Sequence, residues 1–291
     1  MELLQQVVNG VQLGVIYALV ALGYTMVYGV VRLVNFAHGD VYMLGAFVGF
    51  FAATRLGLGF LPTLLVSMAA CALLGVVIER LAYRPLRQAP RIAALTTAIG
   101  VSLLLQNLVR LTVGPNPRGF PELFTQRTLE FAGLRVYNIS LIVLGVSLGL
   151  MLCLQYVVYR TRLGIAMRAV SLDKDAARLM GIDVDKVISV TFAIGSALAA
   201  AAGVMVALAY TRIDPFMGML PGLKAFVAAV LGGIGNIGGA VLGGLLMGVA
   251  ETMVVGMGLS TLRDAVAFAV LITVLLFKPA GLLGRAVREK V

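Results

Sequence analysis

A few polar residues interrupt the long apolar runs of this chain, and their chemistry needs an explanation. Asn35, His38 and Asp40 lie in one short break, and His38 is the only histidine. Glu251 lies within another apolar run, and Arg263–Asp264 stand at the start of a third. Polar groups at membrane depth are costly unless they face other helices or a water-filled cavity. These residues could therefore line a translocation route.

A structural role is the alternative for each of them. Asn35 or Asp40 could cap a helix, and for His38 we favour packing near the membrane interface, because a lone histidine rarely defines a site. Glu251 and the Arg263–Asp264 pair could instead form polar contacts between helices. A proton relay is a weaker interpretation, because no chain of acids and histidines accompanies them.

The glycine-rich segment Gly232–Gly239 contains the spacing G-x-G-x-x-G. In a soluble parallel sheet this spacing binds dinucleotides, but here the neighbouring runs are apolar, and we reject that function. The glycines instead permit a tight break between helices. The spacings Gly239-x-x-x-Gly243 and Gly244-x-x-x-Gly248 predict close helix packing.

Motifs for catalysis or phosphate binding are absent from the sequence. It has no G-x-x-x-x-G-K-[ST] phosphate loop, no HExxH, no CxxC and no Ser–His–Asp arrangement. Cys71 and Cys153 both lie inside apolar runs, without metal-ligand spacing, and we interpret them as small core residues. We therefore expect no enzyme activity, no metal site and no cofactor, and any energy for transport must come from another protein.

The composition places these residues in a membrane protein. Of the 291 residues, 60% are hydrophobic and 12% are charged, with a mean hydropathy of +1.01. A soluble domain cannot bury that much apolar surface, so we predict an all-α polytopic membrane protein that forms one transmembrane domain over residues 1–291. The net charge of +10 does not indicate nucleic-acid binding. Its basic residues sit largely in loops, where they orient the spans and attract anionic lipid of the bilayer.

The apolar runs predict about eight or nine transmembrane helices, with one or two of them short or broken. The predicted spans lie near Val7–Val31, Val41–Thr54, Leu61–Ile78, Ile92–Val113, Ile139–Tyr159, Val187–Tyr210, Leu223–Leu231, Ala240–Gly256 and Ala265–Phe277. Val41–Thr54 and Leu223–Leu231 are too short to cross a bilayer core of about 30 Å unaided, so each could be a half-helix.

Positive charge concentrates in three regions: Arg80–Arg91, the segment 160–186, and the tail Lys278–Lys290. The positive-inside rule places all three in the cytoplasm and the N-terminus outside. Residues 114–138 then form the longest extracytoplasmic loop, which could meet a partner outside or be a plain connector.

The charged segment 160–186 still carries an apolar stripe at helical spacing, from Ile165 to Met180. We predict a short helix over Leu172–Met180, capped by Ser171 and ended by Gly181. Such a helix between spans could dock a soluble partner or rest on lipid headgroups, and the pattern alone leaves both open.

The same segment carries a resemblance to a known family. Its residues 175–181, Asp-Ala-Ala-Arg-Leu-Met-Gly, resemble the E-A-A-x-x-x-G coupling motif of bacterial ABC importer permeases, with Asp in place of Glu. The downstream I-x-L-P of that motif is missing, because Thr191 stands where its isoleucine would be. This departure agrees with the branched-chain amino acid and ribose branch rather than the maltose-type branch.

Within that branch the chain resembles the H-type (LivH-like) permease subunit of branched-chain amino acid ABC importers. The resemblance covers nearly the whole chain, and Asp40 stands where Glu would be expected. The matching motifs are Asn35-Phe36-Ala37-His38-Gly39, Tyr83-Arg84-Pro85-Leu86-Arg87, Thr161-Arg162-Leu163-Gly164, Met167-Arg168-Ala169-Val170, Gly222-Leu223-Lys224-Ala225-Phe226 and Gly233-Ile234-Gly235-Asn236.

The resemblance implies a half-transporter in the bacterial inner membrane. Such a subunit pairs with a similar M-type permease, two cytoplasmic ABC ATPases and a periplasmic substrate-binding protein, and moves leucine, isoleucine or valine inward. Other amino acids, urea, short amides or a sugar are alternative substrates. A secondary transporter or channel is a more distant rival, because inverted repeats and ion-coupling acids are not evident.

Two sets of residues carry these expectations. The ATPase-coupling residues would be Arg168, Leu172, Asp173, Asp175, Ala176, Ala177, Leu179, Met180 and Gly181. The candidate residues of a substrate pathway are Asn35, His38, Asp40, Asn236 and Glu251.

Overall fold

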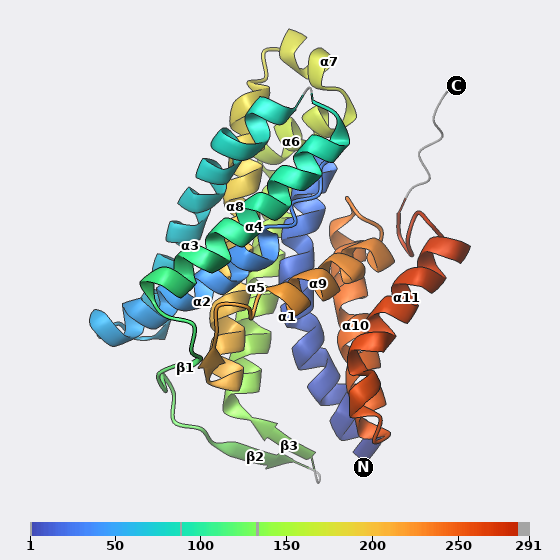
Figure 1. Cartoon of the computed structure of the whole chain (residues 1–291). Coiled ribbons are helices and arrows are strands. Elements are labelled where there is room, and N and C mark those ends of the chain that lie inside the picture. The colour runs from blue at the N-terminus through green and yellow to red at the C-terminus, as the bar shows by residue number, and fades with distance from the viewer. Residues whose placement is uncertain (1, 88, 132–133, 285–291) are drawn as a thin grey trace.

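The computed structural model describes residues 2–87, 89–131 and 134–284, and over these ranges the chain is a bundle of helices (Figure 1). Its α-helices are α1 (Glu2–Val31), α2 (His38–Arg55), α3 (Phe60–Ile78), α4 (Arg91–Thr112), α5 (Asn138–Arg160), α6 (Arg162–Leu172), α7 (Lys174–Leu179), α8 (Val184–Tyr210), α9 (Met219–Gly232), α10 (Ile237–Gly256) and α11 (Arg263–Phe277). A π-helical turn, Glu79–Tyr83, and a 3₁₀ turn, Arg84–Leu86, continue α3, and a second 3₁₀ turn, Ser260–Leu262, precedes α11.

Seven of the described helical segments are long and apolar enough to cross a membrane. They contain α1, α3, α4, α5, α8, α10 and α11. This confirms the predicted all-α polytopic membrane protein. The two stretches that the sequence marks as short correspond to α2 and to α9, which has 14 residues. Both lie across the middle of the bundle rather than along it (Figure 1).

The centre of the bundle is built on α1, which is buried along most of its length and packs against α8, α9 and α10. Small residues make the close approach possible. A Cβ built on Gly244 would overlap Ala18, and one on Gly248 would overlap the backbone of Gly14. The peripheral helices are different, since α4, α5 and α11 expose large side chains such as Leu111 and Phe277. An exposed apolar face of this kind suits lipid contact.

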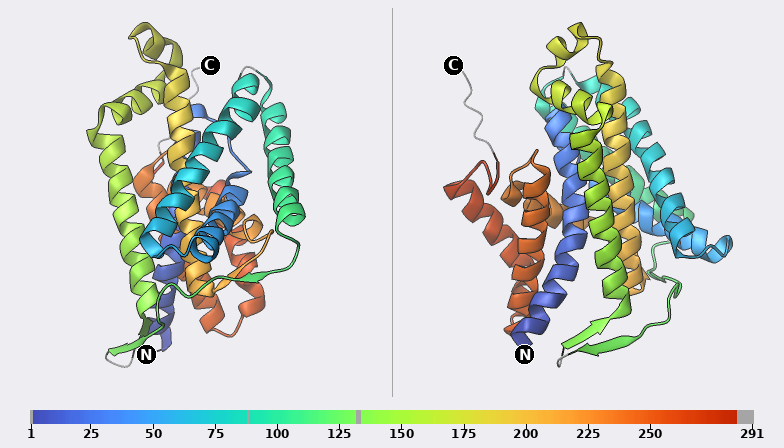
Figure 2. Two further views of the ribbon diagram at one scale, coloured as in Figure 1. Left: turned by 90° about the vertical axis from the view of Figure 1, so that its left-hand side faces the viewer. Right: turned by 180° about the vertical axis from the view of Figure 1, so that it is seen from behind.

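The two ends of the bundle differ in their connections. We call one the basic end, because Arg84, Arg87 and the segment 160–186 lie there, with α7 at its tip (Figure 2). The opposite end, where α1 begins, is the N-terminal end. The chain from residue 278 to 284 folds against the end of α9, with Leu282 donating to Leu231 O over 2.8 Å. Residues 285–290 of the predicted basic tail lie outside the described residues.

Short strands occur in the connections at the N-terminal end. β2 (Thr128–Phe131) and β3 (Leu134–Tyr137) form an antiparallel hairpin within the predicted loop 114–138. β1 (Arg118–Gly119) pairs antiparallel with β4 (Arg212–Ile213), so the same loop is attached to the segment after α8. The Gln5 side chain donates to Arg135 O over 2.9 Å and ties the hairpin to the start of α1. The loop is therefore held at two points.

Candidate functional site

The predicted coupling helix Leu172–Met180 corresponds to the shorter α7, because the chain breaks at Asp173 and Leu172 is the last residue of α6. The Asp173 carboxylate accepts from the backbone N–H groups of Asp175 and Ala176 at 2.8 and 3.0 Å and so caps α7. The prediction that Ser171 is the cap is wrong, since its hydroxyl donates within α6 to Arg168 O. An aspartate favours a helix start because its oxygen satisfies free N–H groups and its charge opposes the helix dipole. Gly181, with φ of +81°, ends α7 as predicted.

The apolar side chains of α7 and its flanks point away from the protein. Leu172, Leu179 and Met180 are 84%, 89% and 82% exposed, whereas Ala177 is buried beneath them. Ile182 donates to Ala177 O over 3.0 Å, and this bond joins the end of α7 to the start of α8. Large exposed apolar groups at a helix tip are typical of a surface that another protein covers.

Two further members of the predicted coupling set, Arg168 and Asp175, form contacts near α7. Arg168 donates to Val158 O, and its guanidinium lies 5.7 Å from the centroid of the Tyr159 ring, which fixes α6 to α5. Lys174, in the first turn of α7, is not a member of the predicted set; burial lowers the pKa of its ammonium, and the neighbouring guanidinium of Arg87 adds to this effect. Asp175 forms an exposed ion pair with Arg178 at 3.3 Å, and such a pair adds little stability.

A second ionic contact ties α8 to the end of α3. Arg87 donates to Glu79, which is fully buried, and also to Asp185 in the first turn of α8. Ser189 donates to the other oxygen of Glu79 over 2.6 Å. One guanidinium thus bridges two carboxylates on two long helices. A displacement of the first turn of α8 would therefore also displace the end of α3.

The predicted polar break holds α2 in place. Asn35 Oδ1 accepts from Ala37 N at 3.1 Å and from the Tyr83 hydroxyl at 2.9 Å. Asp40 is not the cap of α2 but lies in its first turn, where it accepts from Gln106 Nε2 of α4 at 2.9 Å. His38 is buried, with its ring centroid 4.7 Å from that of Tyr24. In this structure the three side chains contact protein rather than an open route.

Glu251 belongs to an ion cluster formed by Lys224, Glu251, Arg263 and Asp264, in which Lys224 and Glu251 are buried and Arg263 and Asp264 are partly exposed. Lys224 Nζ lies 2.8 Å from Glu251 Oε1 and 2.6 Å from Asp264 Oδ1. Arg263 Nε donates to Glu251 Oε2 over 2.9 Å, and the Tyr17 hydroxyl donates to the same oxygen over 3.1 Å. Glu251 is fully buried, so its charge requires these partners. The cluster joins α9, α10 and α11 to α1.

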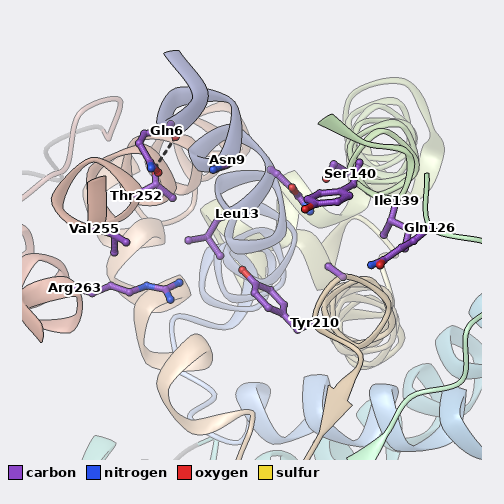
Figure 3. Close-up of a pocket in the computed structure, with 13 residues that line it drawn as sticks. Gln6, Asn9, Leu13, Gln126, Ile139, Ser140, Tyr210, Thr252, Val255 and Arg263 are labelled. Carbon is purple, nitrogen blue, oxygen red and sulfur yellow. Dashed lines mark hydrogen bonds between the residues drawn. The ribbon is translucent and has the colours of Figure 1, made fainter. Parts of the chain in front are cut away.

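Beside the ion cluster lies a polar cavity at the N-terminal end, with a volume of about 500 Å³. Arg263 extends into it toward Leu13 and Tyr210 (Figure 3). Its described lining residues are Gln6, Asn9, Gln12, Leu13, Gln126, Tyr137, Ile139, Ser140, Ala209, Tyr210, Thr252, Val255 and Arg263. They do not include Asn35, His38, Asp40 or Asn236. Glu251 reaches the cavity only through its bond to Arg263.

Asn236 and the glycines after it shape the contact between α9 and α10. Asn236 caps α10, accepting from Gly239 N at 3.0 Å, and donates to Leu283 O over 2.8 Å. A Cβ on Gly239 would overlap Gly232 O, and one on Gly243 would overlap Ala228 O. The packing glycines therefore serve two interfaces, with Gly239 and Gly243 facing α9 and Gly244 and Gly248 facing α1.

Sequence reasoning missed Lys224, Arg87 and most of the cavity. Lys224 lies in the apolar stretch Leu223–Leu231, and a lone lysine in such a stretch was a signal for a buried ion pair. The amides Gln6, Asn9 and Gln12 also stand at helical spacing on α1. Nothing local shows that these amides face Arg263, because that proximity comes from the packing of α1 on α10.

A bundle of membrane-spanning helices, with a polar cavity at one end and the exposed apolar side chains Leu172, Leu179 and Met180 at the other, is the architecture of a multi-pass membrane protein. Residues 6–275 match the family described as branched-chain amino acid transport system / permease component. The chain belongs to this family.

Individual relatives agree with that assignment. The chain is 44% identical to the high-affinity branched-chain amino acid transport system permease protein BraD of Pseudomonas aeruginosa, over 99% of this chain and 98% of the relative. It is 43% identical to the permease protein LivH of Escherichia coli K12, over 99% and 97%. The permease protein LivM of the same bacterium is 27% identical, over 93% of this chain and 68% of LivM.

A solved structure has the same general fold. PsaBC from Streptococcus pneumoniae in complex with Fab superimposes with a TM-score of 0.52 at 12% identity, covering 94% of this chain and 91% of that one. The resemblance to H-type permeases that the sequence motifs predict is confirmed by the family match and by LivH. The names LivH and LivM also indicate a system with a second permease subunit.

Proposed function

We propose that this chain is the H-type permease subunit of an ATP-driven importer that moves leucine, isoleucine and valine inward by alternating access. It acts in the bacterial inner membrane with an M-type permease, two cytoplasmic ABC ATPases and a periplasmic binding protein. The chain itself carries out no catalysis. The family match and the identity to BraD and LivH support the substrate class.

The observation that carries the proposal is the docking tip at the basic end. Leu172, Leu179 and Met180 are exposed beyond the bundle, next to a helix with its own cap. The positive-inside rule places this end in the cytoplasm, where an ATPase could cover the three side chains. Contact with a partner that closes on ATP supplies the differential interaction that a driven conformational change needs.

The packing offers a route for the movement. α7 is joined to α8 through Ala177 and Ile182, and α8 is joined to α3 through Asp185 and Arg87. Because α8 packs on α1, α2 and α3 along its length, a tilt of α8 would change the shape of the bundle centre. In this proposal α8 is the rigid element that the ATPases move.

The candidate pathway residues enter the proposal in different ways. Glu251 holds Arg263 at the edge of the polar cavity, so we place it beside the route. Asn35, His38 and Asp40 fix α2 against α1, α3 and α4, and they would line a route only in a state in which these contacts open. Asn236 would act at the turn between α9 and α10.

Uptake by the reconstituted complex tests the proposal. Proteoliposomes holding both permeases and the ATPases, supplied with the binding protein, should accumulate leucine when ATP is enclosed on the ATPase side. Ala176→Glu adds a charge to the exposed face of α7 and should abolish uptake while ATP hydrolysis continues. Lys186→Ala, also exposed at the basic end, is the matched control and should transport normally.

Three results would count against the proposal. Normal uptake by Ala176→Glu would remove the docking role of α7. Uptake without ATPases, abolished by an ionophore, would indicate a secondary transporter. Uptake of urea or a sugar in place of leucine would change the substrate class.

A further inference from the structure

The polar cavity holds one cationic side chain, Arg263, among its described lining residues. On its buried side, Nε of this arginine donates to Glu251. Within residues 2–87, 89–131 and 134–284, its two Nη groups have no hydrogen-bond partner, and Figure 3 shows the guanidinium directed toward Leu13 and Tyr210. The guanidinium is thus fixed at one edge and free at the edge that faces the cavity.

The ion cluster that contains Arg263 is balanced in charge. Lys224 and Arg263 carry two positive charges and Glu251 and Asp264 carry two negative charges, so the cluster is neutral. Glu251 is buried behind Arg263, and a ligand in the cavity meets the guanidinium first. Arg presents N–H donors in a planar fork that matches a carboxylate.

The wall of the cavity formed by α1 carries neutral amide groups instead of a cation. Gln6, Asn9 and Gln12 follow one another on α1 and line the cavity. Gln12 is half-buried and makes no hydrogen bond to any described residue. Amide oxygens accept hydrogen bonds from an ammonium group. Leu13, Ile139 and Val255 supply apolar surface between the polar groups.

From this arrangement we propose that the cavity is a binding site for a free α-amino acid zwitterion with an apolar side chain. Arg263 binds the α-carboxylate, the amides of α1 accept from the α-ammonium, and the side chain lies on Leu13, Ile139 and Val255. The identity of the ligand rests on the proposed function, because importers of branched-chain amino acids must pass this class of molecule. The volume of about 500 Å³ lies within the range of small-molecule pockets, roughly 300–1,000 Å³.

This site lies on the side of the membrane where substrate enters the permease. It is separate from the site at which the binding protein captures its ligand. The cavity opens to the surface, since Asn9, Gln126 and Tyr210 are exposed. Weak binding suits this position, because a transported molecule must also leave. A zwitterion has no net charge, so its binding leaves the site and the ion cluster that contains Arg263 electrically neutral.

Ligand binding to the intact complex in nanodiscs, without the binding protein, tests the proposal. The probes are leucine, 4-methylpentanoate, which lacks the ammonium, and isoamylamine, which lacks the carboxylate, each followed by saturation-transfer NMR. Arg263→Gln should weaken leucine and 4-methylpentanoate at least about tenfold, because a hydrogen bond to a charged group is lost, and should leave isoamylamine unchanged. Gln12→Leu should weaken leucine and isoamylamine and spare 4-methylpentanoate.

Two controls separate binding from folding. Arg212→Gln removes an exposed guanidinium that lies outside both the ion cluster and the cavity lining, so it should bind leucine like the parent chain. Arg263→Lys keeps the charge and should recover part of the leucine binding. If Arg263→Gln does not fold, Gln12→Leu still decides the matter, because it leaves the ion cluster intact.

The outcomes also distinguish this inference from the proposed function. If the parent complex imports leucine while both variants bind and transport it unchanged, the cavity is only a hydrated vestibule and the inference is wrong. If the complex binds leucine in the cavity but never imports it, the proposed function fails and the site remains.

Discussion

The two ends of the bundle use charge in opposite ways. At the N-terminal end, Lys224 and Glu251 are buried and paired beside a polar cavity. At the basic end most charges lie at the surface, and Leu179 and Met180 are exposed. Burying charge costs free energy, so a paired cluster of this kind marks a place where polar groups are needed inside. Large apolar groups exposed at a charged helix tip are typical of a surface that another protein covers.

The largest effect should come from breaking the buried ion pair between Lys224 and Glu251. Lys224→Met leaves the buried carboxylate of Glu251 with Arg263 as its one charged partner among the described residues and should destabilise the chain by about 3–5 kcal/mol. Thermal unfolding of the purified protein in detergent measures this loss. Lys186→Met removes an exposed lysine and should leave the melting temperature almost unchanged. Equal effects of the two substitutions would show that Lys224 is not buried in an ion pair.

Arg87 tests the exception at the basic end, where one carboxylate is buried. Arg87→Met removes the ion partner of the buried Glu79 and should lower the free energy of unfolding by about 3 kcal/mol. This is the low end for a broken buried pair, because the other partner, Asp185, remains in contact with water. Arg84→Met removes the neighbouring exposed partner of Asp185 and should cost less than about 1 kcal/mol. The same unfolding assay compares them, and the reverse order would contradict the bridging role of Arg87.

The glycines give a smaller effect that separates the centre from the periphery. Gly248→Ala would push a Cβ into the backbone of Gly14 and should destabilise by about 1–2 kcal/mol. Gly149→Ala on α5 meets open space and should stabilise by roughly 0.5–1 kcal/mol through helix propensity. Paired melting curves check the sign of each change. A destabilised Gly149→Ala would indicate that α5 has a packed neighbour at this position.

Local patterns in the sequence predict much of this molecule. Hydrophobic runs locate the long helices, and the charged segment 160–186, with Asp-Ala-Ala at residues 175–177, locates the exposed tip at the basic end. The short stretches near residues 41–54 and 223–231 indicate helices that do not run the full length of the bundle. Each of these features depends on neighbours within a few turns of one helix.

Contacts between distant helices could not be predicted in this way. Lys224, Glu251 and Asp264 lie on three different helices, and only packing brings them together. The position of the break at Asp173 was also missed. Ser171 and Asp173 are both good N-cap residues, and the sequence does not show which of them begins α7. The candidate pathway residues Asn35, His38 and Asp40 are close in sequence, but their contacts are with Tyr83, Tyr24 and Gln106 from distant parts of the chain.

A crosslink at the docking tip tests the central claim most directly. In the complete complex with Cys153, which is exposed, replaced by serine, Leu179→Cys should crosslink to an ATPase subunit through a short bismaleimide. Leu141→Cys, exposed on α5 toward the N-terminal end, should not. We predict that closure of the ATPase subunits on ATP changes the yield of the crosslink at residue 179. Labelling of residue 179 by an impermeant maleimide from the outside, with no crosslink to an ATPase, would contradict the assignment of this end.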